Sequence, residues 1–119
     1  MSSLRARVDA FLDDLFRLEP VIATETGMHE HDDRWPDPSP AGRHAYDQFL
    51  ERWERELRSI DPATLGREDA IDRDFLLLEL DALRFHHAEL READWDALVW
   101  VYLLGSGLFA LVARDFAPL

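Results

Sequence analysis

Apolar residues recur every three or four positions through most of the chain, which is the spacing of helices with one buried face. The pattern predicts long helices over residues 4–18, 40–60 and 68–93. Ser2 or Ser3 is suited to cap the first of these helices, and Ser39 followed by Pro40 is a favourable start for the second. No stretch alternates apolar and polar residues as a strand does. We therefore predict an all-α fold, an antiparallel bundle of four to five helices that forms an incomplete part of a larger helical fold.

The helix predicted over residues 68–93 differs from the others because it carries two apolar stripes. The first stripe consists of Ile71, Phe75, Leu78 and Phe85, and the second of Leu76, Leu80, Leu83 and Leu90. Two stripes cover more than one face of a helix. The pattern therefore predicts a central helix with neighbours on two sides.

Proline and glycine mark the breaks between the first two long helices. Pro20 ends or kinks the first helix and opens a short helical turn over residues 21–26, which Gly27 closes. The alternating prolines of residues 28–39 favour an extended path. We expect this segment to form a strap that Trp35 anchors against the helices.

The last segment is the most apolar part of the chain. Residues 97–113 carry no charge, and Gly105-Ser106-Gly107 divides them. A membrane-spanning helix needs about 20 apolar residues, so we predict instead a buried hairpin of two short helices within residues 95–116. We expect its packing partner to be a missing C-terminal region, another protein or a second copy of the chain.

Composition and charge limit the possible partners and the chemistry. The 119 residues suffice for one helical module over residues 1–119, with 13 basic and 25 acidic side chains and a net charge of −12. This charge repels phosphate backbones and anionic membranes, so we expect neither nucleic acid nor membrane as a partner. The chain has no cysteine, which excludes thiolate chemistry. Its first residues lack a signal-peptide core, which predicts a cytoplasmic location.

One short cluster contains candidate metal ligands. In an extended segment His29 and His31 point the same way and could converge on one ion, with Asp32 or Asp33 completing the ligand set. However, the spacing is not the (i, i+4) spacing of a helical His-Glu-x-x-His site, and no strand precedes the cluster. We favour the alternative that these histidine and aspartate side chains hydrogen-bond loop amides and cap neighbouring helices.

The rest of the chain offers no catalytic constellation. His86 and His87 are adjacent on a predicted helix and therefore point about 100° apart, which is poor geometry for sharing a metal. No serine lies in a Gly-x-Ser-x-Gly setting, and Gly105-Ser106-Gly107 lacks the following lysine of a phosphate loop. We therefore expect no catalytic residue and no cofactor in this chain.

Three blocks of sequence resemble the N-terminal part of bacterial domain-of-unknown-function family number 885. They are PVIATETGMH at residues 20–29, IDP at 60–62 with DAID at 69–72, and YLLGSGLF at 102–109 with RDFAP at 114–118. The resemblance implies a mainly helical protein of several hundred residues that is similar to zinc peptidases. It also implies a zinc-binding His-Glu-x-x-His helix far towards the C-terminus, and no such motif occurs in this chain.

Three hypotheses follow from the sequence. In the first, the chain is a non-catalytic helical scaffold that flanks the substrate channel of a longer zinc-metallopeptidase-like protein. In the second, it is a stand-alone helical module that binds a protein partner or a second copy of itself through residues 97–113. In the third, it is a metal-binding domain that uses His29, His31 and an adjacent aspartate.

Overall fold

The computed structural model describes residues 3–113, and within them it contains helices and no strand. The long helices are α1 (Leu4–Leu18), α3 (Pro40–Arg58), α4 (Arg67–Arg84) and α6 (Ala97–Val112). Two shorter helices, α2 (Pro20–Glu25) and α5 (Glu92–Trp95), lie between them. The prediction of an all-α fold is confirmed.

The local sequence signals explain where the first helices begin and turn. The side chain of Ser3 accepts a hydrogen bond from the amide of Ala6, and Ser39 does the same for Gly42 at the start of α3. Pro20 occupies the first position of α2, where its missing N–H costs nothing. A short 3₁₀ turn, Pro62–Thr64, then reverses the chain between α3 and α4.

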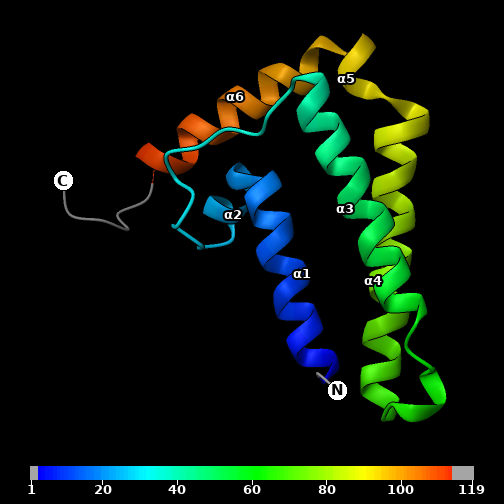
Figure 1. Cartoon of the computed structure of the whole chain (residues 1–119). Helices are drawn as coiled ribbons and strands as arrows, with labels where there is room; N and C mark the ends of the chain where they lie inside the picture. Colours follow the sequence, from blue (N-terminus) through cyan, green and yellow to red (C-terminus); the bar gives the residue numbers. More distant parts are fainter. Residues whose placement is uncertain (1–2, 114–119) are drawn as a thin grey trace.

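The core lies where α1, α3 and α4 run side by side in alternating directions (Figure 1). Phe11 of α1 contacts the rings of Phe49 and Trp53 on α3, with ring centroids 5.4 and 5.6 Å apart. The buried core residues are Leu4, Phe11, Phe49, Leu50, Trp53, Leu57 and Leu80. Such dense contact between aromatic and aliphatic side chains explains why these three helices form one bundle.

Between α4 and α6 the chain turns a corner, and the helix expected over residues 68–93 runs without interruption to Leu90 but is π-helical over its last six residues. The α-helix ends at Arg84, residues Phe85–Leu90 form a π-helical segment, and Arg91 adopts a left-handed backbone with φ of 50°. The amide of Arg91 closes the segment by donating to the carbonyl of His86 at 2.9 Å. No glycine or proline lies within residues 85–91 to signal this break.

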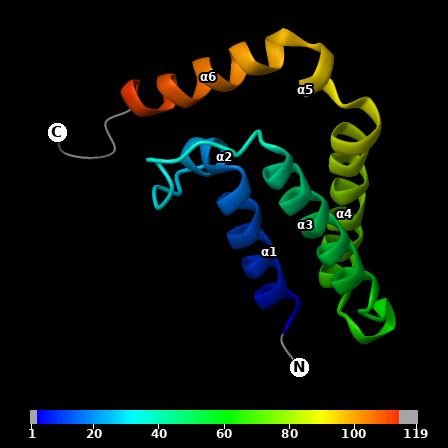
Figure 2. The ribbon, with the colours of Figure 1, turned by 45° about the horizontal axis from the view of Figure 1, so that its top comes forward.

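Beyond the corner, α6 crosses the end of the bundle and leaves it on one side (Figure 2). The predicted hairpin within residues 95–116 is wrong, because α6 runs unbroken through Gly105-Ser106-Gly107. A glycine in a helix costs about 1 kcal/mol relative to alanine but does not forbid the helix. Residues 114–116 of the predicted hairpin lie outside the described residues.

Gly107 is the point where α6 meets the other elements. A Cβ atom there would lie 2.7 Å from the ring of Trp35 and 3.3 Å from a methyl group of Val21. The strap and α2 therefore approach α6 more closely than any larger residue allows. This contact agrees with the expectation that Trp35 anchors residues 28–39 against the helices.

Within the described residues, no single helix is both long enough and apolar enough to cross a membrane. Residues 67–95 and 97–112 satisfy a length and composition test only as a pair, and that pair is bent by 96°.

Candidate functional site

The loop that carries the candidate metal ligands is ordered by hydrogen bonds to one carboxylate. Asp32 accepts from Thr24 Oγ1 at 2.6 Å, and its Oδ2 atom lies 3.0 Å from His29 Nδ1. His31 is half-buried and Asp33 is exposed. Among residues 3–113, no three histidine, aspartate or glutamate side chains gather closely enough to hold a metal ion. The structure thus brings His29 and Asp32 together without His31.

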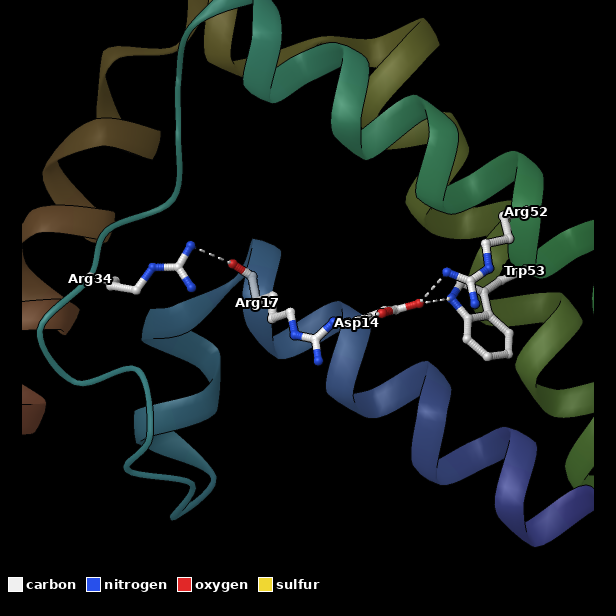
Figure 3. A network of polar contacts seen from close by, with 5 residues as sticks. All are labelled: Asp14, Arg17, Arg34, Arg52 and Trp53. Carbon is white, nitrogen blue, oxygen red and sulfur yellow. Dashed lines mark hydrogen bonds and ion pairs between the residues drawn. The ribbon is translucent and has the colours of Figure 1, made fainter.

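A polar network joins α1, α3 and the strap (Figure 3). Asp14 Oδ2 accepts hydrogen bonds from Trp53 Nε1 and from Arg52 Nη1, both at 3.0 Å. Arg17 approaches the other oxygen of Asp14 at 3.4 Å, and the main-chain oxygen of Arg17 accepts from Arg34 Nη2 at 3.3 Å. The network fixes the end of α1 against both neighbours.

Next to this network lies a cavity of about 550 Å³. Its wall is formed by the end of α1, the strap, the start of α3, the π-helical corner, α5 and the first turns of α6. This volume falls within the range of small-molecule sites, which is roughly 300–1,000 Å³. π-Helical turns and left-handed non-glycine residues cluster at functional sites, and both border this cavity.

Most charged groups of the cavity on the corner side are paired. Arg43 and Arg91 both bind Asp94, and the hydrogen bond from Arg43 holds the pKa of Asp94 below its ordinary value. His86 Nδ1 lies 3.1 Å from a carboxylate oxygen of Glu92. These contacts tie α3 and the π-helical segment to α5.

Glu19 and Tyr46 line the same cavity without such a partner. Glu19 is half-buried, and no side chain of residues 3–113 donates a hydrogen bond to its carboxylate. Burial raises the pKa of Glu19 above its ordinary value of 4.5. The pKa of the nearby Tyr46 hydroxyl is also raised, first by burial and then by the negative charge of Glu19. Glu19 therefore lines the cavity as a carboxylate whose charged form burial disfavours. No basic side chain of residues 3–113 forms an ion pair with it.

His86 and His87 contribute to the packing of the corner. His87 stacks on the ring of Tyr46 at a centroid distance of 4.7 Å, and its Nε2 atom lies 3.0 Å from Asp47. His86 points instead to Glu92. As the sequence indicates, the two adjacent side chains point to different partners. Sequence reasoning missed Glu19 as a cavity residue, because its only signal was its position before Pro20.

A second surface feature is apolar and uncovered. One stripe of α6 faces away from the molecule, with Tyr102, Phe109 and Val112 exposed to 68%, 69% and 82%. On α4, the stripe of Ile71, Phe75 and Leu78 is exposed as well. The second stripe, which includes the buried Leu80, packs against α3 instead. The expectation that this helix has neighbours on two sides therefore fails within the described chain.

Comparison with known sequences assigns the family. The profile of a family described as "Bacterial protein of unknown function (DUF885)" matches residues 20–118. The chain belongs to the DUF885 family. The match covers all three blocks on which the resemblance was based, and it carries no statement about zinc or peptidase activity. No curated protein matches this DUF885 chain.

A solved structure shares the fold of the DUF885 chain. It is described as "a putative lipoprotein of unknown function" from Shewanella oneidensis and is 24% identical, with a TM-score of 0.88. The match covers 99% of the present chain but 21% of the Shewanella protein. The DUF885 chain thus spans about one fifth of the length of that protein.

The same comparison corrects one expectation. We expected a cytoplasmic location because the first residues lack a signal-peptide core. The Shewanella protein with the same fold is described as a lipoprotein, which contradicts that expectation. A missing leader pattern in this stretch of sequence was too weak a basis for assigning a compartment.

Proposed function

We propose that this DUF885 chain is a non-catalytic helical scaffold, whose exposed apolar stripes pack against a further region of a longer protein and flank its substrate channel. The observation that carries the proposal is the uncovered stripe of α6, in which Val101, Leu108 and Phe109 are exposed to 61%, 59% and 69%. Soluble proteins rarely leave a contiguous apolar surface of this kind in water. The chemistry of the longer protein, a zinc-dependent hydrolysis, is then supplied by that further region.

The dimensions of the molecule support this proposal. Its radius of gyration is 16.1 Å, whereas a compact domain of this length has one of about 13.5 Å. The chain exposes 8454 Å², compared with roughly 6,600 Å² for a compact monomer of this size. The difference exceeds the roughly 800 Å² that each partner buries in a standard stable interface.

A measurement on the isolated chain tests the proposal. We expect purified protein to bind a hydrophobic dye and to associate without a defined stoichiometry in size-exclusion chromatography with light scattering. Replacing Val101 and Phe109 by glutamine should suppress both effects and leave the thermal midpoint nearly unchanged, because substitutions at exposed positions change stability little. The matched control replaces the buried Ala110 of the same helix by glutamine, which should unfold α6.

Two outcomes would contradict the scaffold proposal. A monodisperse monomer that binds no dye would mean that the apolar stripe of α6 is stable in water without a partner. A defined dimer that binds no dye would support the second candidate, a stand-alone module that pairs through α6. The reading frame after residue 119 provides an independent test, since the proposal expects it to encode His-Glu-x-x-His.

A further inference from the structure

The cavity between α1, α3 and the corner contains one carboxylate that lacks a counter-ion. Glu19 lines the cavity, is half-buried, and receives no hydrogen bond or ion pair from a side chain of residues 3–113. The arginines of the same wall do not neutralise it. Arg43 and Arg91 bind Asp94, and Arg17 binds Asp14.

Arg34 does not fill this role either. Its guanidinium donates to the main-chain oxygen of Arg17, and the residue is exposed. A half-buried carboxylate without a partner is costly, and a cationic ligand is the group that relieves this cost. Among the carboxylates of this wall, Glu19 is therefore the half-buried one without a partner.

The cavity also offers aromatic surface. Trp35, Tyr46 and Trp100 are all among the residues that line it. The indole N–H of Trp100 donates to the carbonyl of Ala93 at 3.1 Å, which fixes the ring against α5. Aromatic faces attract organic cations, and such contacts strengthen when the site excludes water.

The charge of the whole chain acts in the same direction. With a net charge of −12, the protein raises the local concentration of cations and disfavours anions. An anionic ligand would meet both this field and the uncompensated Glu19. The charge and the lining of the cavity thus select the same class of ligand.

We propose that this cavity binds a small organic ammonium ion, with Glu19 as its counter-ion and the rings of Trp35, Tyr46 and Trp100 as its aromatic wall. The site lies within one chain, so it does not depend on what covers the stripe of α6. A negative result for the ligand site would therefore leave the scaffold proposal intact, and the reverse also holds.

Isothermal titration calorimetry with choline tests the site. The control ligand is 3,3-dimethylbutan-1-ol, which has the shape of choline without its charge. We expect choline to bind at least about tenfold more tightly than the alcohol, because only choline neutralises the carboxylate. Glu19→Gln should weaken choline binding by at least about tenfold and leave the alcohol unaffected. The matched control Glu51→Gln alters an exposed carboxylate of α3 outside the cavity and should change neither affinity.

A second variant tests the contribution of the aromatic wall. Trp100→Leu keeps an apolar side chain but removes a ring, so choline should bind about threefold more weakly. Circular dichroism verifies that each variant keeps its helix content. Absence of choline binding, equal affinity for the two compounds, or full affinity in either cavity variant would overturn the proposal.

Discussion

Asp14 is the residue on which the contact between α1 and α3 most directly depends. It accepts a hydrogen bond from the indole of Trp53, which is only 3% exposed. Asp14→Ala leaves this N–H without an acceptor, so the free energy of unfolding should fall by roughly 1–3 kcal/mol. Urea denaturation measures the loss. Asp13→Ala, an exposed neighbour on the same helix, is the control and should change stability by less than about 0.5 kcal/mol.

Glu19 links stability to pH. Because burial raises its pKa above the ordinary value of 4.5, the folded state binds the proton more tightly than the unfolded state. The penalty for the charged form is therefore absent at low pH and grows as the pH rises through the folded-state pKa. We expect Glu19→Gln to raise the thermal midpoint at pH 7 but not at pH 4. An equal gain at both pH values would show that the charge of Glu19 carries no penalty.

At the scale of elements, the two glycines of α6 have opposite roles. Gly107→Leu would drive a side chain into Trp35 and Val21, so we expect the strap to detach and the thermal midpoint to fall. Tryptophan fluorescence should shift to the red as Trp35 becomes more exposed. Nothing lies within 4 Å of a Cβ placed at Gly105. Gly105→Ala should therefore stabilise the helix by up to about 1 kcal/mol, and a loss of stability there would contradict the packing described for α6.

The helices themselves could be predicted from the sequence because their signals are local. The spacing of Phe49, Leu50, Trp53 and Leu57 places one face of α3 in the core, and Ser39 caps its start. The π-helical end of this helix and the turn at Arg91 could not be predicted, because no glycine or proline lies within residues 85–91 to signal them. The same holds for the cavity. It forms only because residues near Glu19 and Asp94, far apart in sequence, meet across the end of the bundle.

At the scale of the whole molecule, the balance of charge should govern the response to salt. Twenty-five acidic side chains face 13 basic ones, so repulsion between like charges opposes the compact state. Most ion pairs are exposed, and such pairs contribute little. We expect the thermal midpoint to rise when sodium chloride is increased from about 0.02 M to about 0.3 M, as the repulsion is screened. A fall would mean that the arginine–carboxylate pairs outweigh the repulsion.

The direction in which α6 leaves the corner depends on the number of residues in the π-helical segment before it. A π-helical turn accommodates one residue more than an α-helical turn would. Deleting a single residue within Phe85–Leu90 would leave an ordinary α-helical turn and keep the residues that follow in step with α4. An inserted residue would instead rotate the end of this helix by about 100° about its axis. Because α6 follows a bend of 96°, that rotation would swing the whole of α6, and Gly107 with it, away from the strap.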